Sequence, residues 1–231
     1  SDALDALGVC LNLTPEQIAE CVVSIGVGFL FAPAHHSAMK HAIGPRRELA
    51  MRTLFNVLGP LTNPAFVQRQ VLGVYDAALC EPLANALREL GSIHALVLHS
   101  EDGLDEISIA APTRGFELHH GAINPIEIVP EMYGHAHDSL EGLQVATALE
   151  SATLIRAVLA GETGSALRKA RSIITLNAGA GIYVSGKVPT LTEGVVAAEV
   201  AITSGAAIEK LEAFAALTQE LAQASKEVSD Q

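Results

Sequence analysis

Residues Gln70–His99 read QVLGVYDAALCEPLANALRELGSIHALVLH and predict a strand, a helix and a second strand. The apolar runs 70–75 and 94–99 are short and rich in aliphatic residues, as buried strands are. Residues 78–90 repeat leucine along one helical face, and Gly91-Ser92 ends that helix. A strand–helix–strand unit of about 30 residues joins parallel strands by a right-handed crossover. We therefore expect an α/β fold whose central sheet contains a parallel βαβ unit surrounded by helices.

The segments on either side of this unit predict further helices and a hairpin. Helices are expected over 1–7, 14–23, 35–58, 149–159, 165–184, 191–204 and 207–226. Thr14 and Gln17 form a capping box at the start of one of them. A short strand is expected over 107–110, a hairpin over 115–119 and 125–129, and an irregular loop over 130–145. We expect residues 1–60 to form a helical segment that belongs partly to a helical lobe, and residues 61–231 to form an α/β domain.

Composition excludes several classes of protein. The chain has 231 residues and a formal net charge of −12, so it lacks the basic surface that nucleic-acid binding needs. No apolar run approaches the ~20 residues that span a bilayer, and no membrane partner is expected. The three cysteines are far apart and form no CxxC pair, which favours a reducing cytoplasm over a disulfide framework.

A basic cluster begins with the stretch HHSAMKH at His35–His41 and continues through Arg46, Arg47 and Arg52. In an acidic protein this is a local cationic patch, and arginine suits the two-pronged binding of a carboxylate or phosphate. The alternative is a solvated helix face with surface ion pairs. A zinc site is not expected, because the histidine spacing is unusual for zinc and no cysteine or carboxylate completes it.

An acidic cluster, EDGLDE at Glu101–Glu106, directly follows the second predicted strand. Ligands of open α/β sheets gather at the carboxyl ends of strands. Adjacent carboxylates hold Mg²⁺, which completes its shell with water and substrate phosphates. Such an ion would make an acidic protein compatible with a pyrophosphate. The alternative is an ordinary acidic surface turn.

Two glycine-containing stretches are interpreted structurally. GPLTNP at Gly59–Pro64 is typical of a rigid turn that joins two parts of a chain. NAGAG at Asn177–Gly181 lies in a strongly helical stretch and does not have the spacing of a dinucleotide-binding loop. Close packing of helices through small residues is therefore the favoured interpretation.

Taken together, these motifs resemble the anthranilate phosphoribosyltransferases. The resemblance rests on GFLFAP at 28–33, on His36 with AMK at 38–40, and on RREL at 46–49. It continues through RTLFNVLGPLTNP at 52–64 and through GLDEIS at 103–108. It covers essentially the whole chain, with two mild departures, Ser37 where the family often has Pro and Ala50 where it often has Gly.

The resemblance implies a fold, a reaction and a set of site residues. The fold is that of the type III phosphoribosyltransferases and nucleoside phosphorylases, usually a cytoplasmic homodimer. The reaction is the Mg²⁺-dependent transfer of phosphoribose from phosphoribosyl pyrophosphate to anthranilate in tryptophan biosynthesis. By matching position, Arg46 contacts the anthranilate carboxylate, His36 lines the anthranilate channel, and Asp105 and Glu106 are the Mg²⁺ ligands. No catalytic base is implied, because the aniline nitrogen is already uncharged.

The family's glycine-rich phosphate loop, of the form G-T-G-G-D, is not found in this sequence. We therefore expect the chain to be the C-terminal two-thirds of such an enzyme, with little or no turnover by itself. Two alternatives stay open. One is a pyrimidine nucleoside phosphorylase, although its Ser/Lys-rich base-binding motif is not visible. The other is a non-enzymatic helical interaction module.

Overall fold

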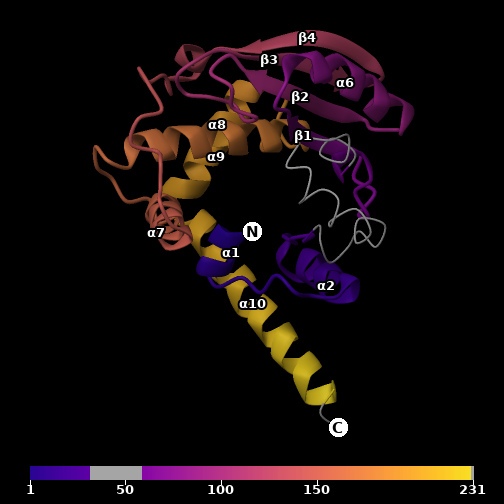
Figure 1. Cartoon of the computed structure of the whole chain (residues 1–231), viewed down its shortest axis with the longest axis vertical. Helices are drawn as coiled ribbons and strands as arrows, with labels where there is room; N and C mark the ends of the chain where they lie inside the picture. The colour runs from indigo at the N-terminus through magenta and orange to yellow at the C-terminus, as the bar shows by residue number, and fades with distance from the viewer. Residues whose placement is uncertain (32–58, 230–231) are drawn as a thin grey trace, which may run out of the picture. The chain divides into compact units, whose positions relative to one another are not determined.

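The computed structural model describes residues 1–31 and 59–229, and it divides them into two compact units (Figure 1). The helical unit comprises residues 1–31, 145–162 and 202–229, and the α/β unit comprises residues 59–144 and 163–201. Two segments that were assigned to the α/β domain, 145–162 and 202–229, thus group with the N-terminal helices instead. The expected boundary at residue 60 adjoins residues outside the described part and stays a prediction.

The α/β unit is built on a four-stranded sheet in the order β1-β2-β3-β4. The strands are β1 Arg69–Gly73, β2 His94–Ser100, β3 Thr113–His119 and β4 Ala122–Ile128. β1 and β2 are parallel, joined by the short helix η2 (Ala77–Leu79) and by α6 (Cys80–Glu89). The predicted βαβ unit is therefore confirmed. β3 and β4 are antiparallel to their neighbours, so the sheet is mixed.

The hairpin between β3 and β4 turns tightly at His120 and Gly121, with His119 paired to Ala122. Both turn residues have positive φ, 48° and 83°. This combination is that of the two-residue turn whose twist matches a β-hairpin. The hairpin is confirmed, and its strands begin earlier than the sequence analysis placed them.

The predicted strand over 107–110 is wrong, because residues 107–110 form no strand. Side chains, rather than a neighbouring strand, satisfy the backbone here. Ile107 N donates to Asn177 Oδ1 over 2.9 Å, and Ser108 N donates to Thr113 Oγ1 over 3.1 Å. The apolar residues that suggested a strand are nevertheless buried, Ile107 and Ile109 being at most 1% exposed.

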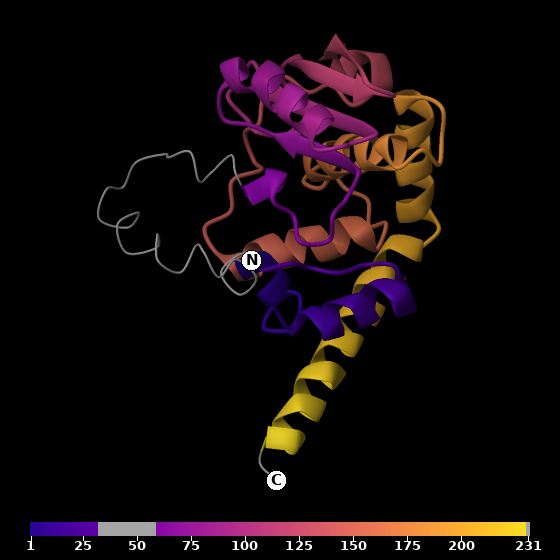
Figure 2. The same ribbon diagram turned by 90° about the vertical axis from the view of Figure 1, so that its right-hand side faces the viewer.

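Helices cover both faces of the sheet. On one face, α6 packs Leu83, Ala84 and Leu87 against the strands, and Figure 2 shows α6 lying in front of them. On the other face lie α8 (Arg168–Val184) and α9 (Leu191–Thr203). β2 alternates between the two cores, with Ala95 and Val97 facing α6. The result is a three-layer α/β/α arrangement, as expected for a central sheet surrounded by helices.

The small residues of NAGAG pack α8 against α9, which confirms the structural interpretation of that stretch. A Cβ added at Gly179 would lie 2.7 Å from Val195 Cα. A Cβ added at Gly194 would lie 2.3 Å from Gly179 O. The two helices therefore cross at a point where only glycine leaves room for the opposite backbone.

The helical unit collects four helices from distant parts of the sequence. They are α1 Asp2–Ala6, α2 Pro15–Ile25, α7 Ala148–Leu159 and α10 Ala206–Ser229, the long yellow helix of Figure 2. The capping box of Thr14 and Gln17 is present at the start of α2. The core of this unit consists of Val9, Leu13, Ile18, Cys21 and Phe214.

Two further expectations concern the membrane and the cysteines. No single helix in the described ranges is long and apolar enough to cross a membrane, although the bent pair Leu191–Thr203 with Ala206–Ala224 meets the length and composition test. Cys10, Cys21 and Cys80 are all free thiols, as their spacing predicted.

Candidate functional site

The acidic turn Glu101–Glu106 lies directly after the carboxyl end of β2, where ligands of α/β sheets gather. Backbone hydrogen bonds hold it: Gly103 N donates to Ser100 O over 2.9 Å, and Ser100 N donates to Leu104 O over 3.0 Å. Gly103 has a φ of 91°, a conformation that glycine adopts without strain. Asp105 and Glu106 end the turn with both side chains exposed.

The end of β1 lies against this turn through Gly73. A Cβ added at Gly73 would lie 1.5 Å from Asp105 O, so any other residue would push the turn away. His99, at the same end of β2, directs its Nδ1 to Val74 O at 2.8 Å. The carboxyl ends of the two parallel strands therefore set the position of Asp105.

Asn177 on α8 holds the residue that follows the two carboxylates. Its Oδ1 accepts from Ile107 N over 2.9 Å, and its Nδ2 donates to Ile107 O over 2.9 Å. The same Nδ2 also donates to Ile173 O within α8. Asp102 supports the turn from its other side, because its carboxylate accepts from Ser108 Oγ. The backbone on both sides of Asp105 and Glu106 is thus fixed by side chains.

The electrostatics of the acidic turn suit a hard cation. The pKa of Glu106 is raised, first because neighbouring protein groups displace part of its hydration and second because of the charge of Asp105. A bound cation would oppose both effects, since it stabilises the ionised carboxylate. Two adjacent exposed carboxylates fit Mg²⁺, which binds through one or two protein oxygens and keeps several waters.

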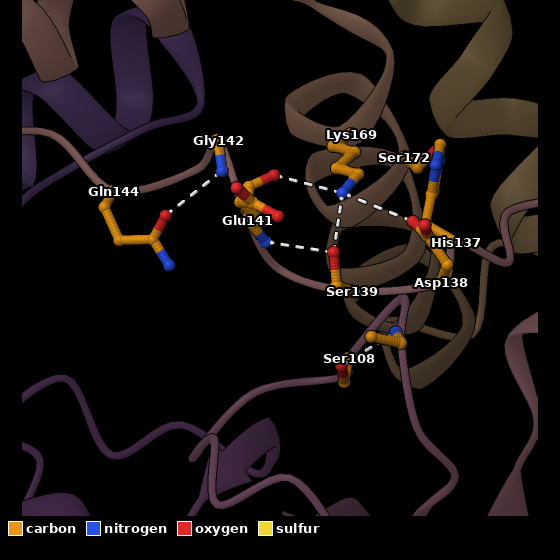
Figure 3. Close-up of polar contacts among 10 residues, drawn as sticks. Ser108, His137, Asp138, Ser139, Glu141, Gly142, Gln144, Lys169 and Ser172 are labelled. Carbon is orange, nitrogen blue, oxygen red and sulfur yellow. Dashed lines mark hydrogen bonds and ion pairs between the residues drawn. The ribbon is translucent and has the colours of Figure 1, made fainter.

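A second polar cluster lies in the loop that follows the short helix η3 (Pro130–Tyr133). Figure 3 shows Lys169 of α8 reaching Ser139, the backbone oxygen of Glu141, and Asp138. Its Nζ donates to Ser139 Oγ over 3.0 Å and lies 3.5 Å from Asp138 Oδ1. The sequence predicted an irregular loop over 130–145. Residues 134–145 confirm it, whereas residues 130–133 form η3 instead. The sequence did not indicate that Lys169 would anchor this loop.

Two histidines of the same loop contact Ser172, which lies three residues after Lys169 on α8. His135 Nδ1 lies 3.2 Å and His137 Nε2 lies 3.0 Å from Ser172 Oγ. Burial is the main cause that lowers the pKa of both histidines. They are therefore neutral hydrogen-bonding partners of a buried hydroxyl near neutral pH, and they tie the loop to α8.

The turn motif at Gly59–Pro64 borders a groove of about 500 Å³ that also involves β1 and α6. Asn63 stabilises the turn, because its Oδ1 accepts from Ala65 N over 2.9 Å. Phe66 follows with a φ of 51° and 88% of its surface exposed. Residues 59–61 are helical and the turn follows them, so the turn predicted over Gly59–Pro64 is confirmed only in its later part.

The structure describes two of the four predicted site residues. Asp105 and Glu106 lie together on the acidic turn. Arg46 and His36, predicted to contact anthranilate, lie outside the described residues. The residues that sequence reasoning missed are Gly73 and Asn177, which act through backbone contacts that no local motif signals.

Comparison with known proteins identifies related sequences. The sequence pattern of the glycosyl transferase family, a/b domain, matches residues 1–208. The anthranilate phosphoribosyltransferase of Azotobacter vinelandii is 54% identical over 94% of this chain and 63% of its own length. That of Cellvibrio japonicus is 55% identical over 96% of this chain and 64% of its own length. This chain therefore spans less than two-thirds of the relatives that it matches.

Solved structures that resemble this chain carry the same enzyme name as these relatives. The anthranilate phosphoribosyltransferase of Thermus thermophilus is 40% identical, with a TM-score of 0.86 over 94% of this chain and 64% of that one. The Saccharomyces cerevisiae enzyme in complex with PRPP and Mg is 27% identical, with a TM-score of 0.84 over 95% of this chain and 62% of that one. The resemblance inferred from the motifs and the predicted fold class are both confirmed.

Proposed function

Because this chain belongs to the glycosyl transferase family through its a/b domain, we propose that it is part of an anthranilate phosphoribosyltransferase of tryptophan biosynthesis. The reaction transfers phosphoribose from phosphoribosyl pyrophosphate to the amine of anthranilate and releases pyrophosphate. The observation that carries the proposal is the 54% identity to the Azotobacter vinelandii enzyme over 94% of the chain. The relatives described above give no support to a nucleoside phosphorylase or to a non-enzymatic interaction module.

In this proposal Asp105 and Glu106 hold Mg²⁺, which would neutralise charge on the leaving pyrophosphate. The exposure of both carboxylates supports this role, because Mg²⁺ retains water and substrate oxygens in its shell. Gly73 and Asn177 keep the acidic turn in place at the ends of β1 and β2. Positioning and electrostatics then account for the rate enhancement, and no catalytic base is assigned.

Arg46 and His36 are proposed to bind the second substrate. A guanidinium pairs with a carboxylate through two parallel hydrogen bonds, which would orient anthranilate with its amine toward the ribose. His36 is proposed to line the channel through which anthranilate enters. Both assignments rest on the motif match at 36–49.

The proposed setting of the enzyme is a cytoplasmic homodimer. Three free thiols support a reducing compartment. The homodimer rests on the family resemblance, and light scattering on the enzyme would measure its mass directly. A monomer at micromolar concentration would contradict that part of the proposal.

The decisive experiment follows the loss of anthranilate fluorescence after adding phosphoribosyl pyrophosphate and Mg²⁺. We expect little or no turnover from the 231 residues alone, because no G-T-G-G-D phosphate loop occurs among them. The chain is therefore also joined to the part of the Cellvibrio japonicus enzyme that it does not cover. We expect this chimaera to consume anthranilate in a Mg²⁺-dependent manner.

Matched variants of the chimaera assign the site. Asp105→Asn with Glu106→Gln should reduce turnover by roughly a hundredfold or more, as expected when charge stabilisation is lost. Glu131→Gln, which removes an exposed carboxylate on η3, should leave turnover unchanged. A well-folded chimaera that never consumes anthranilate would overturn the proposed function, and equal activity in all variants would overturn the metal assignment.

A further inference from the structure

Three potential metal ligands share one face of the sheet at the amino end of β2. His94 is the first residue of β2 and pairs directly with His119, the last residue of β3. Glu117 lies two residues before His119 on the same strand. Because side chains alternate between faces, directly paired residues and residues two apart point the same way. In the described part of the chain, these side chains form one group whose ligand atoms all lie within 4.8 Å of one another.

The contacts within this group place nitrogen and oxygen atoms at close range. His94 Nε2 lies 2.8 Å from Glu117 Oε1. Tyr183 of α8 donates its hydroxyl to the same oxygen over 2.6 Å. The rings of His94 and His119 stack with centroids 4.2 Å apart. Glu117 therefore lies among three ring side chains, close to the imidazoles of two of them.

We propose that His94, Glu117 and His119 form a binding site for a divalent transition metal, with Zn²⁺ as the reference ion. Two imidazoles and one carboxylate are a known donor set for Zn²⁺, and the fourth position takes water. Ligand atoms about 2.0–2.1 Å from a tetrahedral ion are separated from one another by roughly 3.4 Å. The group is thus within a small adjustment of that geometry.

One movement, a turn of the His119 ring, completes the site. The planes of the His94 and His119 rings are only 16° apart, so one ring must turn to aim its nitrogen at a shared ion. His119 can do so, because it is partly exposed and the terminal torsion of histidine is broad. His94, at 1% exposure, stays in place as the fixed ligand.

The surroundings orient the proposed ligands. His94 Nε2 already faces the carboxylate of Glu117 at 2.8 Å, and a metal bound there would replace the proton that these two groups now share. The Tyr183 hydroxyl orients the carboxylate from outside the ligand shell, as second-shell groups do in metal sites. Arg69 carries a positive charge near His94, which disfavours a cation at this site. Its guanidinium is held by the backbone, because Nη1 donates to Val184 O over 2.9 Å.

This site is distinct from the acidic turn. His94 begins β2 and the acidic turn follows the end of the same strand, so the two are separated by about 20 Å of strand. Their donors also differ: imidazole suits Zn²⁺, whereas two carboxylates suit Mg²⁺. Zinc binding should therefore be insensitive to Mg²⁺.

The test is a titration of the 231-residue chain with Co²⁺ and Zn²⁺ in excess Mg²⁺. Tetrahedral Co²⁺ absorbs visible light, and competition by Zn²⁺ gives its affinity. We expect one equivalent to bind with this spectrum. Affinity should fall roughly tenfold or more in His119→Ala and in Glu117→Gln, since each removes a ligand. His120→Ala is the matched control, because His120 stacks on His119 with centroids 4.4 Å apart but is not one of the three ligands.

Circular dichroism of each variant checks that the fold is retained. Binding by histidines elsewhere in the chain would persist unchanged in His119→Ala, and that result would overturn the proposal. It would also be overturned if the folded chain bound no Co²⁺ in tetrahedral form, or if His120→Ala weakened binding as much as His119→Ala.

Discussion

A single amide, that of Asn177, satisfies both backbone groups of the residue that follows the two carboxylates. Ile107 is buried, so its N–H and C=O have no access to water when that amide is lost. An unsatisfied buried backbone group costs about 1–3 kcal/mol. Asn177 therefore stabilises the fold and also fixes the position of Glu106.

Replacement of Asn177 by alanine should lower the free energy of unfolding by about 1–3 kcal/mol in urea denaturation. It should also weaken Mg²⁺ binding, measured by calorimetry. Asn85→Ala is the control, since Asn85 only donates to Glu81 O on the exposed side of α6. A loss in Asn177→Ala no larger than that in Asn85→Ala would contradict the assigned role.

Glu106 should make Mg²⁺ binding depend on pH over a range that lies above the pKa of an ordinary glutamate. Its pKa is raised by partial desolvation and by Asp105, so it takes up a proton earlier as the pH falls. Without metal, the stability linked to this proton is present below the unfolded pKa and is lost as pH rises through the raised folded pKa. Calorimetric Mg²⁺ titrations from pH 4 to 7, compared between wild type and Glu106→Gln, measure this; identical pH profiles would refute it.

The crossing of α8 and α9 shows how two elements depend on glycine. Gly179 faces the backbone of Val195, whereas Gly181 on the same helix has nothing within 4 Å of an added Cβ. Substitutions at the two positions therefore separate the effect of packing on stability from the effect of helix propensity. One lies at a contact between elements and the other does not.

Gly179→Ala should destabilise the protein by about 1–3 kcal/mol, because the added methyl group overpacks the crossing. Gly181→Ala should instead stabilise it by about 0.5–1 kcal/mol through helix propensity alone. Urea denaturation of the two variants gives both values. Changes of the same sign would show that the helices do not meet as described.

The division into two units assigns one buried cysteine to each. Cys21 lies in the core of the helical unit with Phe214, and Cys80 lies in the core of the α/β unit with Leu83. Both thiols are at most 2% exposed, and burial raises the pKa of each. Their rates of chemical labelling therefore report the opening of each unit separately.

Phe214→Ala should remove about 3–5 kcal/mol of local stability and accelerate the labelling of Cys21 more than that of Cys80. Leu83→Ala should reverse this order. Mass spectrometry of thiol labelling under native conditions measures both rates. Equal acceleration of the two cysteines by either variant would show that the units open together.

The predictions from sequence that held rest on local physics. Residues 70–99 correctly predicted the βαβ unit, because the periodicities of helices and strands are encoded over a few neighbouring residues. The position of Asp105 and Glu106 followed, since a loop after a parallel strand has a defined place at the sheet. The capping box at Thr14 and the interpretation of Asn177–Gly181 were equally local.

Tertiary structure decided what depends on contacts between distant residues. Residues 107–110 were predicted as a strand from their apolar side chains, yet hydrogen bonds from Asn177 and Thr113 take the place of a strand partner. The fit of Gly73 against Asp105 requires the assembled sheet, as does the pairing of His94 with His119. The grouping of residues 145–162 and 202–229 with the N-terminus does not follow from local patterns either, because an apolar helix face does not specify which partner it will bury.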